Sequence, residues 1–274
     1  MNASTSASKP LRTAASPRLV VDVVGEGEPI VFLHGIGGNR TNWASQLAGL
    51  SDIWRCVAFD FRGYGDSEDV PGALDFFDFT QDVARVLAEL GILRCHLVGL
   101  SMGGLVAQAF YARHRDKVIS LAIAGSRPGS SPVFEDSQRF AAERAKPIEQ
   151  GAAALADSLL PRLLGPDVTP EVRETIRASL ARLRPESYKK VLSARLSIAP
   201  FLDLSSIAVP TLLIAGSHDQ VAPPAQMQAM AAAIPGSVLE IMPEAGHLMN
   251  IEQPARFDAA IRNFLSSIKR QSAA

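Results

Sequence analysis

The sequence predicts an α/β fold in which helices cover both faces of a mostly parallel sheet, with a helical segment inserted into it. Two observations carry this prediction. Apolar runs of strand length alternate along the chain with segments of helical periodicity, an order typical of parallel sheets. Between residues 127 and 204 the strand-like runs stop, and prolines divide several short helical patterns. A segment of this length is too long for a loop and is therefore expected to be an inserted helical unit.

The strand candidates are short apolar runs, because the strands of a parallel sheet are buried on both faces. Ile30–Leu33, for example, reads Ile-Val-Phe-Leu without a polar residue. Seven such runs are expected to be strands: Leu19–Val24, Ile30–Leu33, Arg55–Phe59, His96–Gly99, Val118–Ala124, Thr211–Ala215 and Val238–Met242.

Helical patterns fill the intervals between these runs and follow the last of them. The five expected helices are Trp43–Leu50, Thr80–Leu90, Met102–His114, Ala225–Ile234 and Ala255–Ile268. The second has the clearest pattern, since its apolar residues recur every three or four positions. Asp78 is expected to cap this helix and Gly91 to end it. In the last helix, Pro254 lies near the first turn, where proline fits.

This pattern divides the chain into three parts. Residues 1–17 are rich in Ser, Ala and Thr and are expected to form a disordered tail. Residues 18–126 and 205–270 hold the strands and helices of the α/β core. Residues 127–204 are expected to form a helical cap between two strands of the core, with a second, independent domain as the alternative.

The composition is that of an ordinary globular protein. Of the 274 residues, 47% are hydrophobic and 20% are charged, and the net charge is −1. No run of Lys or Arg favours nucleic acid as a partner. The N-terminus lacks the apolar stretch of a signal peptide, and no segment is long enough to span a membrane. We therefore expect a cytoplasmic protein that binds a small molecule, and the sequence is compatible with a homo-oligomer.

The chain contains two cysteines, Cys56 and Cys95, and each borders an apolar run. Core thiols in a reducing compartment are favoured over a disulfide. The cysteines show no metal-ligand spacing, so neither a metal nor another cofactor is expected.

The most informative motif is Gly99-Leu100-Ser101-Met102-Gly103, between a predicted strand and a predicted helix. A serine at such a strand-to-helix turn projects its hydroxyl from the backbone, and the glycines make room for the bend. The pattern alone is weak, since roughly 0.1 matches are expected by chance in a chain of this length. Its position at the end of a strand makes Ser101 a candidate nucleophile.

Two other predicted strands lead to side chains that activate a serine. Thr211–Ala215 leads to Asp219, and Val238–Met242 leads to His247. Because the carboxyl ends of parallel strands meet at one edge of a sheet, Ser101, Asp219 and His247 are expected to converge there. A neutral imidazole takes the serine proton near pH 7, and a carboxylate fixes its tautomer. In isolation, Asp219 would be interpreted as a turn residue and His247 as a loop histidine.

A glycine-rich turn, residues 34–38, follows the second predicted strand. Such a turn can aim a backbone N–H at the oxygen that becomes negative during acyl transfer. The N–H groups of Ile36 and Met102 are the expected donors of this oxyanion hole, and His34 and Gly35 are expected to contact the substrate. A phosphate-binding loop is the alternative, but the Gly-x-Gly-x-x-Gly spacing and the lysine of a Walker loop are absent.

With these motifs, the chain resembles the α/β-hydrolase superfamily from about Leu19 to Ile268. The matching segments occur in register: His34-Gly35, Asp60–Ser67, Gly99–Gly104, Gly216 with Asp219 and Pro223-Pro224, and Gly246-His247. The resemblance implies an α/β-hydrolase fold with an inserted cap, and it gives the turn after Asp60 an architectural part.

The serine at the nucleophile position excludes haloalkane dehalogenases and epoxide hydrolases, which carry an aspartate there. Within the superfamily the chain is similar to 3-oxoadipate enol-lactonases in Gly99–Gly104, Pro210–Gly216 and His247–Pro254. This resemblance implies a serine hydrolase that cleaves a carboxylic ester or lactone through an acyl-enzyme. If such a substrate carries a carboxylate, Arg127 is the expected partner, because it follows a strand at the entrance of the cap. Arg139 and Arg144 are weaker candidates for this contact.

Three alternatives stay open. A C–C hydrolase of vinylogous diketones from aromatic ring cleavage would use the same three residues, although such enzymes often carry Asn where this chain has Leu100. A general carboxylesterase would use the same chemistry on simpler esters. A ligand receptor on the same fold is the non-enzyme alternative, although receptors of this kind often lose triad residues.

Overall fold

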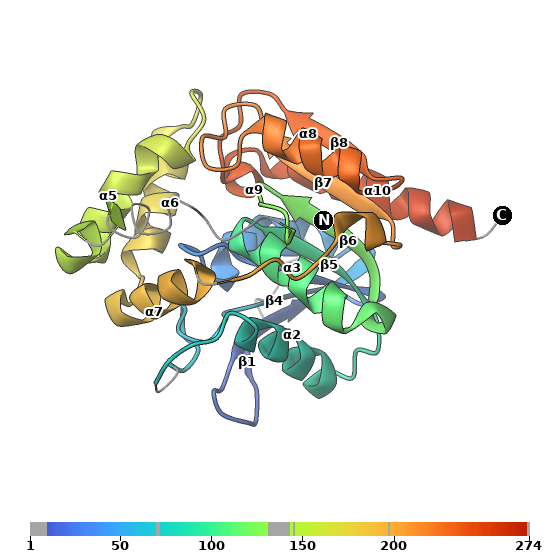
Figure 1. Ribbon diagram of the computed structural model, residues 1–274, viewed down its shortest axis with the longest axis horizontal. Coiled ribbons are helices and arrows are strands. Elements are labelled where there is room, and N and C mark those ends of the chain that lie inside the picture. Colours follow the sequence, from blue (N-terminus) through green and yellow to red (C-terminus); the bar gives the residue numbers. More distant parts are fainter. Residues whose placement is uncertain (1–9, 70–71, 131–142, 145, 197, 273–274) are drawn as a thin grey trace, which may run out of the picture.

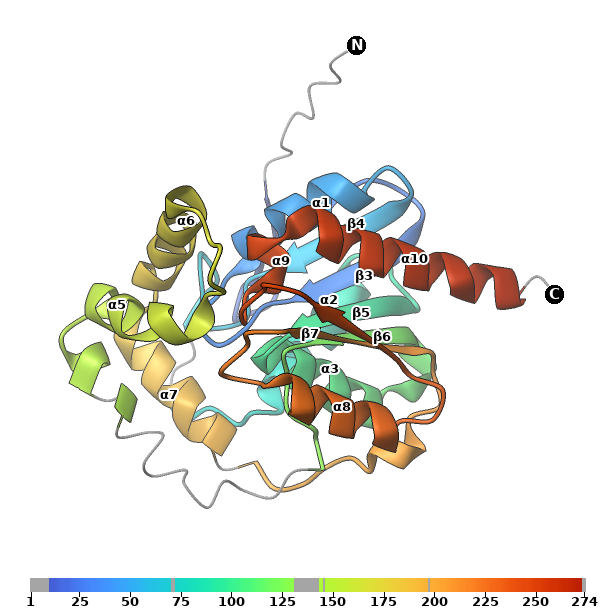
Figure 2. The same ribbon diagram turned by 90° about the horizontal axis from the view of Figure 1, so that it is seen from above.

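The structure is a computed structural model that describes residues 10–69, 72–130, 143–144, 146–196 and 198–272. Within these residues, helices pack on both faces of one central eight-stranded sheet. Three further helices lie together at one side of the molecule, near one edge of that layered core (Figure 1 and Figure 2). The predicted α/β layering is confirmed.

The strands of the sheet are ordered β1-β2-β4-β3-β5-β6-β7-β8. Their bounds are β1 (Leu11–Arg12), β2 (Val20–Val24), β3 (Glu28–Leu33), β4 (Trp54–Phe59), β5 (Cys95–Leu100), β6 (Val118–Ala124), β7 (Thr211–Gly216) and β8 (Val238–Met242). The β1–β2 and β2–β4 pairs are antiparallel, and every other pair in the sheet is parallel. The seven predicted strands are therefore confirmed, with ends that shift by one or two residues.

The N-terminal segment departs from the prediction of a disordered tail through residue 17. Leu11 and Arg12 form β1, which pairs with β2. The next residue, Thr13, is buried and exchanges hydrogen bonds with Leu19: its hydroxyl accepts from the Leu19 N–H, and its own N–H donates to the Leu19 carbonyl. A two-residue strand carries too little apolar pattern to be predicted. Residues 1–9 lie outside the described residues.

Helices cover the two faces of the sheet. Their bounds are α1 (Ala44–Leu50), α2 (Asp78–Glu89), α3 (Met102–Arg113), α8 (Pro224–Ala233) and α10 (Pro254–Ser272). Figure 2 shows α1 and α10 on one face and α3 and α8 on the other, and the buried residues of α2 join the same core as those of α3. Because strand side chains alternate between faces, Ile30 and Phe32 join the core beneath α1 and α10, whereas Val31 and Leu33 join the core beneath α2, α3 and α8.

The five predicted helices are confirmed, with differences at their ends. The first is preceded by a 3₁₀ turn, η1 (Arg40–Trp43). Two further 3₁₀ turns occur at η2 (Arg115–Lys117) and η3 (Leu204–Ser206), and a short α-helical turn at α9 (Met249–Glu252). Gly91 ends α2 as predicted, with φ +65°, and the Ile92 N–H reaches back to the Leu87 carbonyl at 2.8 Å. Asp78 was expected to cap α2 but is its first helical residue; Phe77 stands at the cap position.

Between β6 and β7 the described residues form α5 (Ala152–Leu163), α6 (Pro170–Ala181) and α7 (Pro185–Leu196), which we call the cap helices. Thr169 caps α6, and Pro170 occupies its first turn. Polar contacts attach these helices to the core. The side-chain amides of Asn39 and Asn42 both donate to the Ser179 hydroxyl, at 3.0 and 2.9 Å.

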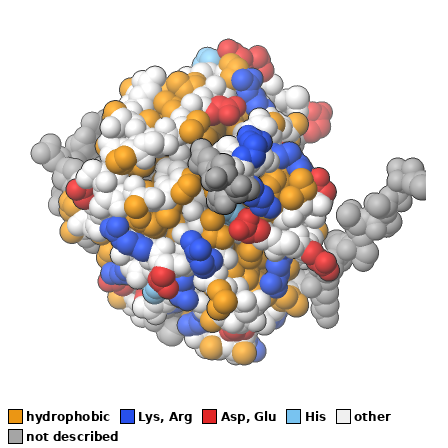
Figure 3. Space-filling view, turned by 90° about the vertical axis from the view of Figure 1, so that its right-hand side faces the viewer, with side chains coloured by type: hydrophobic (Ala, Val, Ile, Leu, Met, Phe, Trp, Pro, Cys, Tyr) orange, Lys and Arg blue, Asp and Glu red, His pale blue; other side chains and the backbone are white. Residues whose placement is uncertain are grey.

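On the side of the molecule away from the cap helices, basic and acidic side chains are interspersed (Figure 3). Among the residues that the structure describes, no helix combines the length and the apolar character needed to cross a bilayer.

Cys56 and Cys95 are buried and form no disulfide, as predicted, and burial raises the pKa of each thiol to about 12.

Candidate active site

Ser101 lies at the turn between β5 and α3, with φ 55° and ψ −114°. A residue other than glycine rarely adopts such a φ, and strain of this kind is typical of functional sites. The Ser101 N–H donates to the Ala124 carbonyl at 2.8 Å, which ties the turn to the end of β6. Ser101 lines a cavity between the core and the cap helices. The serine motif therefore forms a strained turn between a strand and a helix, and Ser101 is half-buried there.

The glycines on either side of Ser101 are required by close approaches of the backbone. A Cβ on Gly99 would overlap the Gly103 carbonyl, and a Cβ on Gly103 would overlap the Leu33 carbonyl. Backbone atoms inside a packed sheet cannot move aside at low cost. The Gly-x-Ser-x-Gly spacing thus follows from how closely α3 packs on β5 and β3.

Asp219 and His247 form a buried pair beside this turn. The Nδ1 atom of His247 lies 2.8 Å from Oδ2 of Asp219, and both residues are 3% exposed. The other carboxylate oxygen, Oδ1, accepts the N–H groups of Val221 at 2.7 Å and Ala222 at 2.8 Å. Since the carboxylate only accepts, Nδ1 carries the proton of a neutral His247 and Nε2 is left with a free lone pair.

Gly125 directly follows the last residue of β6 and packs against the Asp219–His247 pair. It has φ +49°, and a Cβ there would be 3.0 Å from Oδ2 of Asp219 and 3.1 Å from Nδ1 of His247. Sequence analysis does not single out Gly125. The available signal is a glycine that directly follows a buried strand, which is typical of a left-handed turn.

The glycine-rich turn after β3 packs on Ser101. A Cβ on Gly35 would lie 3.3 Å from the Cβ of Ser101, and the Gly38 N–H donates to the Gly35 carbonyl at 3.0 Å. Ile36 follows Gly35 on the wall of the cavity. Met102 is the first residue of α3, so its N–H has no acceptor within the helix. The two backbone groups predicted as oxyanion donors thus belong to the two turns that meet at Ser101.

His34 lines the cavity, but both of its ring nitrogens contact the backbone. Nδ1 lies 2.8 Å from the Gly35 carbonyl, and Nε2 accepts the Phe61 N–H at 3.2 Å. Burial lowers the pKa of the imidazole, which favours its neutral form. His34 therefore joins the glycine-rich turn to the segment after β4, and its ring nitrogens are engaged there rather than toward the cavity.

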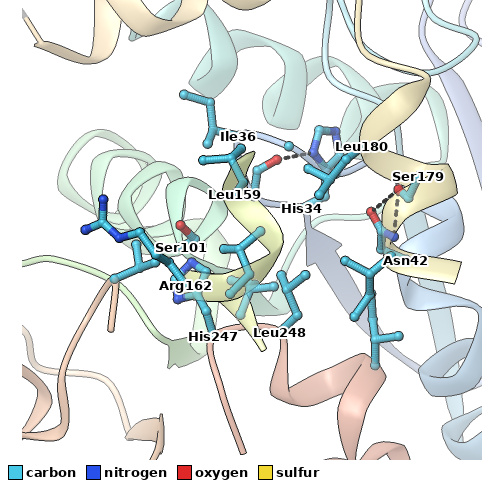
Figure 4. Close-up of a pocket in the computed structure, with 18 of the residues that line it drawn as sticks. His34, Ile36, Asn42, Ser101, Leu159, Arg162, Ser179, Leu180, His247 and Leu248 are labelled. Atoms are coloured by element: carbon cyan, nitrogen blue, oxygen red, sulfur yellow. Dashed lines mark hydrogen bonds between the residues drawn. The ribbon is translucent and has the colours of Figure 1, made fainter. Parts of the chain in front are cut away.

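The cavity and the open solvent at its mouth together hold about 880 Å³. Figure 4 shows Ser101 and His247 on its core side and Leu159 and Leu180 facing them from the cap helices. Its walls are mainly apolar, with Leu159, Leu163, Ile176, Leu180, Leu248 and Ile251 among the lining residues. Such a space suits a small, largely apolar substrate.

Arg127 does not line this cavity. It is buried, burial lowers the pKa of its guanidinium, and the Gln108 side-chain amide donates to its carbonyl at 3.0 Å. The arginines on the cavity wall are Arg144, Arg162 and Arg195. Arg144 was a weaker candidate from the sequence, Arg162 and Arg195 were missed, and Arg139 lies outside the described residues.

Comparison with known proteins identifies the family. A profile described as "Alpha/beta hydrolase family" matches residues 30–260 of the chain. The chain belongs to the alpha/beta hydrolase family. The predicted superfamily resemblance and fold are thereby confirmed.

Two kinds of relative resemble this hydrolase over most of its length. It is 31% identical to 3-oxoadipate enol-lactonase 1 of Acinetobacter baylyi over 245 residues, which cover 88% of this chain and 89% of the relative. The solved enol-lactonase from Burkholderia xenovorans is 31% identical, with a TM-score of 0.85 over 93% of this chain and all of its own. A thermophilic esterase from Thermogutta terrifontis, solved with malate bound, is 32% identical, with a TM-score of 0.88 over 95% of this chain and 99% of its own. The predicted enol-lactonase resemblance is confirmed.

Glu252 of this hydrolase joins the loop that carries His247 to the cap helices. Its carboxylate accepts three backbone N–H groups: Gly165 at 2.9 Å, Gly246 at 2.8 Å and Leu248 at 3.1 Å. Two of these donors flank His247, and the third follows α5. Burial raises the pKa of Glu252 despite these bonds. Sequence analysis missed Glu252, because no local pattern shows that its side chain reaches back to the histidine loop.

Proposed function

We propose that this hydrolase is a serine hydrolase that cleaves a carboxylic ester or lactone through an acyl-enzyme. One observation carries the proposal: Ser101, on its strained turn, and His247 line the same cavity. Behind the cavity wall, Nδ1 of His247 lies 2.8 Å from Oδ2 of Asp219. A serine hydroxyl is a weak nucleophile until a base removes its proton. The pair supplies a neutral imidazole whose Nε2 is available as that base.

In the first half of the reaction, Ser101 Oγ attacks the carbonyl carbon while Nε2 of His247 takes its proton. The carbonyl oxygen becomes negative and is stabilised by the N–H groups of Ile36 and Met102, each worth a few kcal/mol in the transition state. The C–O bond then breaks, and the leaving alkoxide takes the proton from His247. In a lactone this alcohol stays attached to the acyl group on Ser101.

In the second half, water attacks the acyl-enzyme and His247 accepts a proton from it. The carbonyl oxygen again becomes negative at the same two N–H groups. When the tetrahedral intermediate collapses, Ser101 leaves with the proton from His247 and the carboxylic acid is released. The enzyme regains its starting state without a cofactor.

The substrate enters between the core and the segment 127–204, to which we assign the function of a cap. Apolar side chains of α5 and α6 line the cavity opposite Ser101, so the cap decides which esters reach it. The enol-lactonase relatives at 31% identity support a lactone as the substrate class. The esterase at 32% identity favours a general carboxylesterase as the second candidate.

A fluorophosphonate probe and a substrate panel test the proposal. We expect the probe to label the wild-type protein and to leave Ser101→Ala unlabelled. Labelling that does not depend on Ser101 would overturn the serine mechanism. Turnover of an enol-lactone above that of simple aryl esters supports a lactonase; comparable rates support a carboxylesterase, and turnover of a ring-cleavage dienoate alone would replace both with the C–C hydrolase.

Gly125→Ala is expected to lower kcat by about 10- to 100-fold, because the new methyl displaces the Asp219–His247 pair, and small displacements of catalytic groups have effects of this size. Its Cβ would stand 3.0 Å from Oδ2 of Asp219. Steady-state kinetics and thermal unfolding of the same preparations measure the effect.

Gly236→Ala is the matched control for this variant. Gly236 has φ +68°, close to the +49° of Gly125, but nothing lies within 4 Å of its Cβ position. Both variants therefore carry the backbone strain of about 1–2 kcal/mol expected of alanine at a left-handed position, and only Gly125→Ala touches the pair. Equal kcat values for the two variants would contradict the prediction.

A further inference from the structure

The loop between β8 and α9 carries His247, and the two halves of this loop are held by different parts of the molecule. The core holds the first half. The Ser217 hydroxyl accepts the Glu244 N–H at 2.9 Å, and the Ala245 carbonyl accepts the His218 N–H at 2.9 Å. Glu244 has φ +57°, which is a strained value for a residue other than glycine. A strained loop keeps its conformation because its surroundings hold it there.

The second half of the loop packs on the cap segment that follows α5. The His247 N–H donates to the carbonyl of Leu163, the last residue of α5, at 2.7 Å. Gly165 and Gly246 are in close contact. A Cβ on Gly246 would overlap the backbone from Leu163 to Gly165, and a Cβ on Gly165 would overlap the Glu244 carbonyl. Because such close packing leaves the two backbones no room to move separately, a shift of the cap segment would also shift His247.

Glu252, the last residue of α9, joins the cap segment to both neighbours of His247. Its Oε2 atom accepts the N–H groups of Gly165 and Gly246, and its Oε1 atom accepts the Leu248 N–H. Both oxygens therefore face donors, and an ionised carboxylate is the form that accepts on both. A glutamine at this position would turn its NH₂ group toward one of the N–H groups. Burial makes the charge of Glu252 costly, and its pKa is raised accordingly.

We propose that Glu252 is a positioning residue that acts through His247. By holding Gly165 of the cap against both neighbours of His247, it fixes the backbone from which the imidazole reaches Ser101. Asp219 holds Nδ1 of the ring, and the position of the backbone then determines where Nε2 lies. The inference rests on the proposed function, because it gives the cap a part in placing the base of that mechanism. The cap thus contributes to proton transfer as well as to the choice of substrate.

A double-variant cycle tests this inference. We measure kcat/KM for para-nitrophenyl acetate with the wild type, Glu252→Gln, His247→Ala and the double variant, subtract spontaneous hydrolysis and record thermal unfolding of each protein. In the wild-type background, Glu252→Gln is expected to lower kcat/KM by about 10- to 100-fold, the effect of displacing a catalytic group by about 1 Å. In the His247→Ala background it is expected to change kcat/KM by less than about twofold, because no imidazole is left to be misplaced.

A role confined to the fold or to substrate binding gives a different result. If Glu252 only kept the cap over the cavity, Glu252→Gln would raise KM and lower kcat/KM by the same factor in both backgrounds. Glu89→Gln is the matched control, because Oε2 of Glu89 also accepts a backbone N–H, that of Ala14, at 2.8 Å. Glu89 lies on α2 and does not line the cavity. Its variant should have the kcat/KM of the wild type.

Gly165→Ala changes the same junction from the cap side and is measured in parallel, so that the test stands if Glu252→Gln does not fold. The new Cβ would lie 2.9 Å from Oε2 of Glu252 and 2.9 Å from the nitrogen of Gly246. We expect the same pattern from this variant: a loss of kcat/KM in the wild-type background, and a change of less than about twofold in His247→Ala.

The outcomes separate the inference from the proposed function. Equal losses in the two backgrounds, or activity of Glu252→Gln within about twofold of the wild type, would overturn the positioning role. In both cases the loss caused by His247→Ala alone still supports the proposed function. Activity of His247→Ala within about tenfold of the wild type would overturn the proposed function, and the inference with it.

Discussion

Ser101→Ala is expected to lower kcat for the preferred ester by at least about 10³-fold, because it removes the atom that forms the acyl-enzyme. The backbone should keep its geometry. Alanine has the same Cβ as serine at this φ of 55°, and the Ser101 hydroxyl is not needed for the bond from its N–H to the Ala124 carbonyl. The loss should therefore occur in kcat, with little change in thermal stability.

The measurement is a steady-state assay of the wild type and of Ser101→Ala. The two proteins are purified separately, so that traces of wild-type enzyme do not account for the activity measured for the variant. Ser158→Ala serves as the control, because the Ser158 hydroxyl donates to the Leu155 carbonyl within α5 and has no part in the proposed mechanism. Activity of Ser101→Ala within tenfold of the wild type would mean that another group attacks the carbonyl.

The core of the fold was predictable because its signals are local. Each buried strand of the parallel sheet is a continuous apolar run, so β3 and β7 can be recognised without knowing their neighbours. The short strand β1 was missed because its two residues are exposed and its pairing with β2 is a tertiary contact. The cap on α2 was misplaced by one residue, since Phe77 occupies a position that sequence preferences give to a polar side chain.

The residues of the candidate site likewise fall into two groups, those that a local sequence signal predicts and those whose place depends on tertiary packing. Ser101, Asp219 and His247 each follow a strand, and the geometry of a parallel sheet brings the ends of those strands together. Arg127 also follows a strand, but its side chain is buried near Arg195 and does not line the cavity. Arg195 and Glu252 depend on how helices distant in sequence pack, and no local pattern reports that packing.

His247→Ala is expected to lower kcat by at least about 10³-fold, and Asp219→Asn by somewhat less. The reason for the second effect lies in the hydrogen bonds of the carboxylate. Oδ1 of Asp219 accepts two backbone N–H groups, from Val221 and Ala222. In Asp219→Asn the amide oxygen must stay on those donors, which turns the amide NH₂ toward Nδ1 of His247. Nδ1 then becomes an acceptor and the tautomer with the proton on Nε2 is favoured, so only a minority of the molecules hold an imidazole that can take the proton of Ser101, whereas His247→Ala leaves none.

Because Ser101 and His247 act as one unit in this mechanism, their effects should not multiply. The double variant Ser101→Ala/His247→Ala is expected to be about as inactive as either single variant. A histidine that only supported the fold would lower kcat further in the Ser101→Ala background, by the same factor as in the wild type. The decisive comparison is therefore kcat for the four proteins of this cycle, measured on one ester with thermal unfolding recorded for each. Multiplicative losses would show that His247 does not deliver its effect through Ser101.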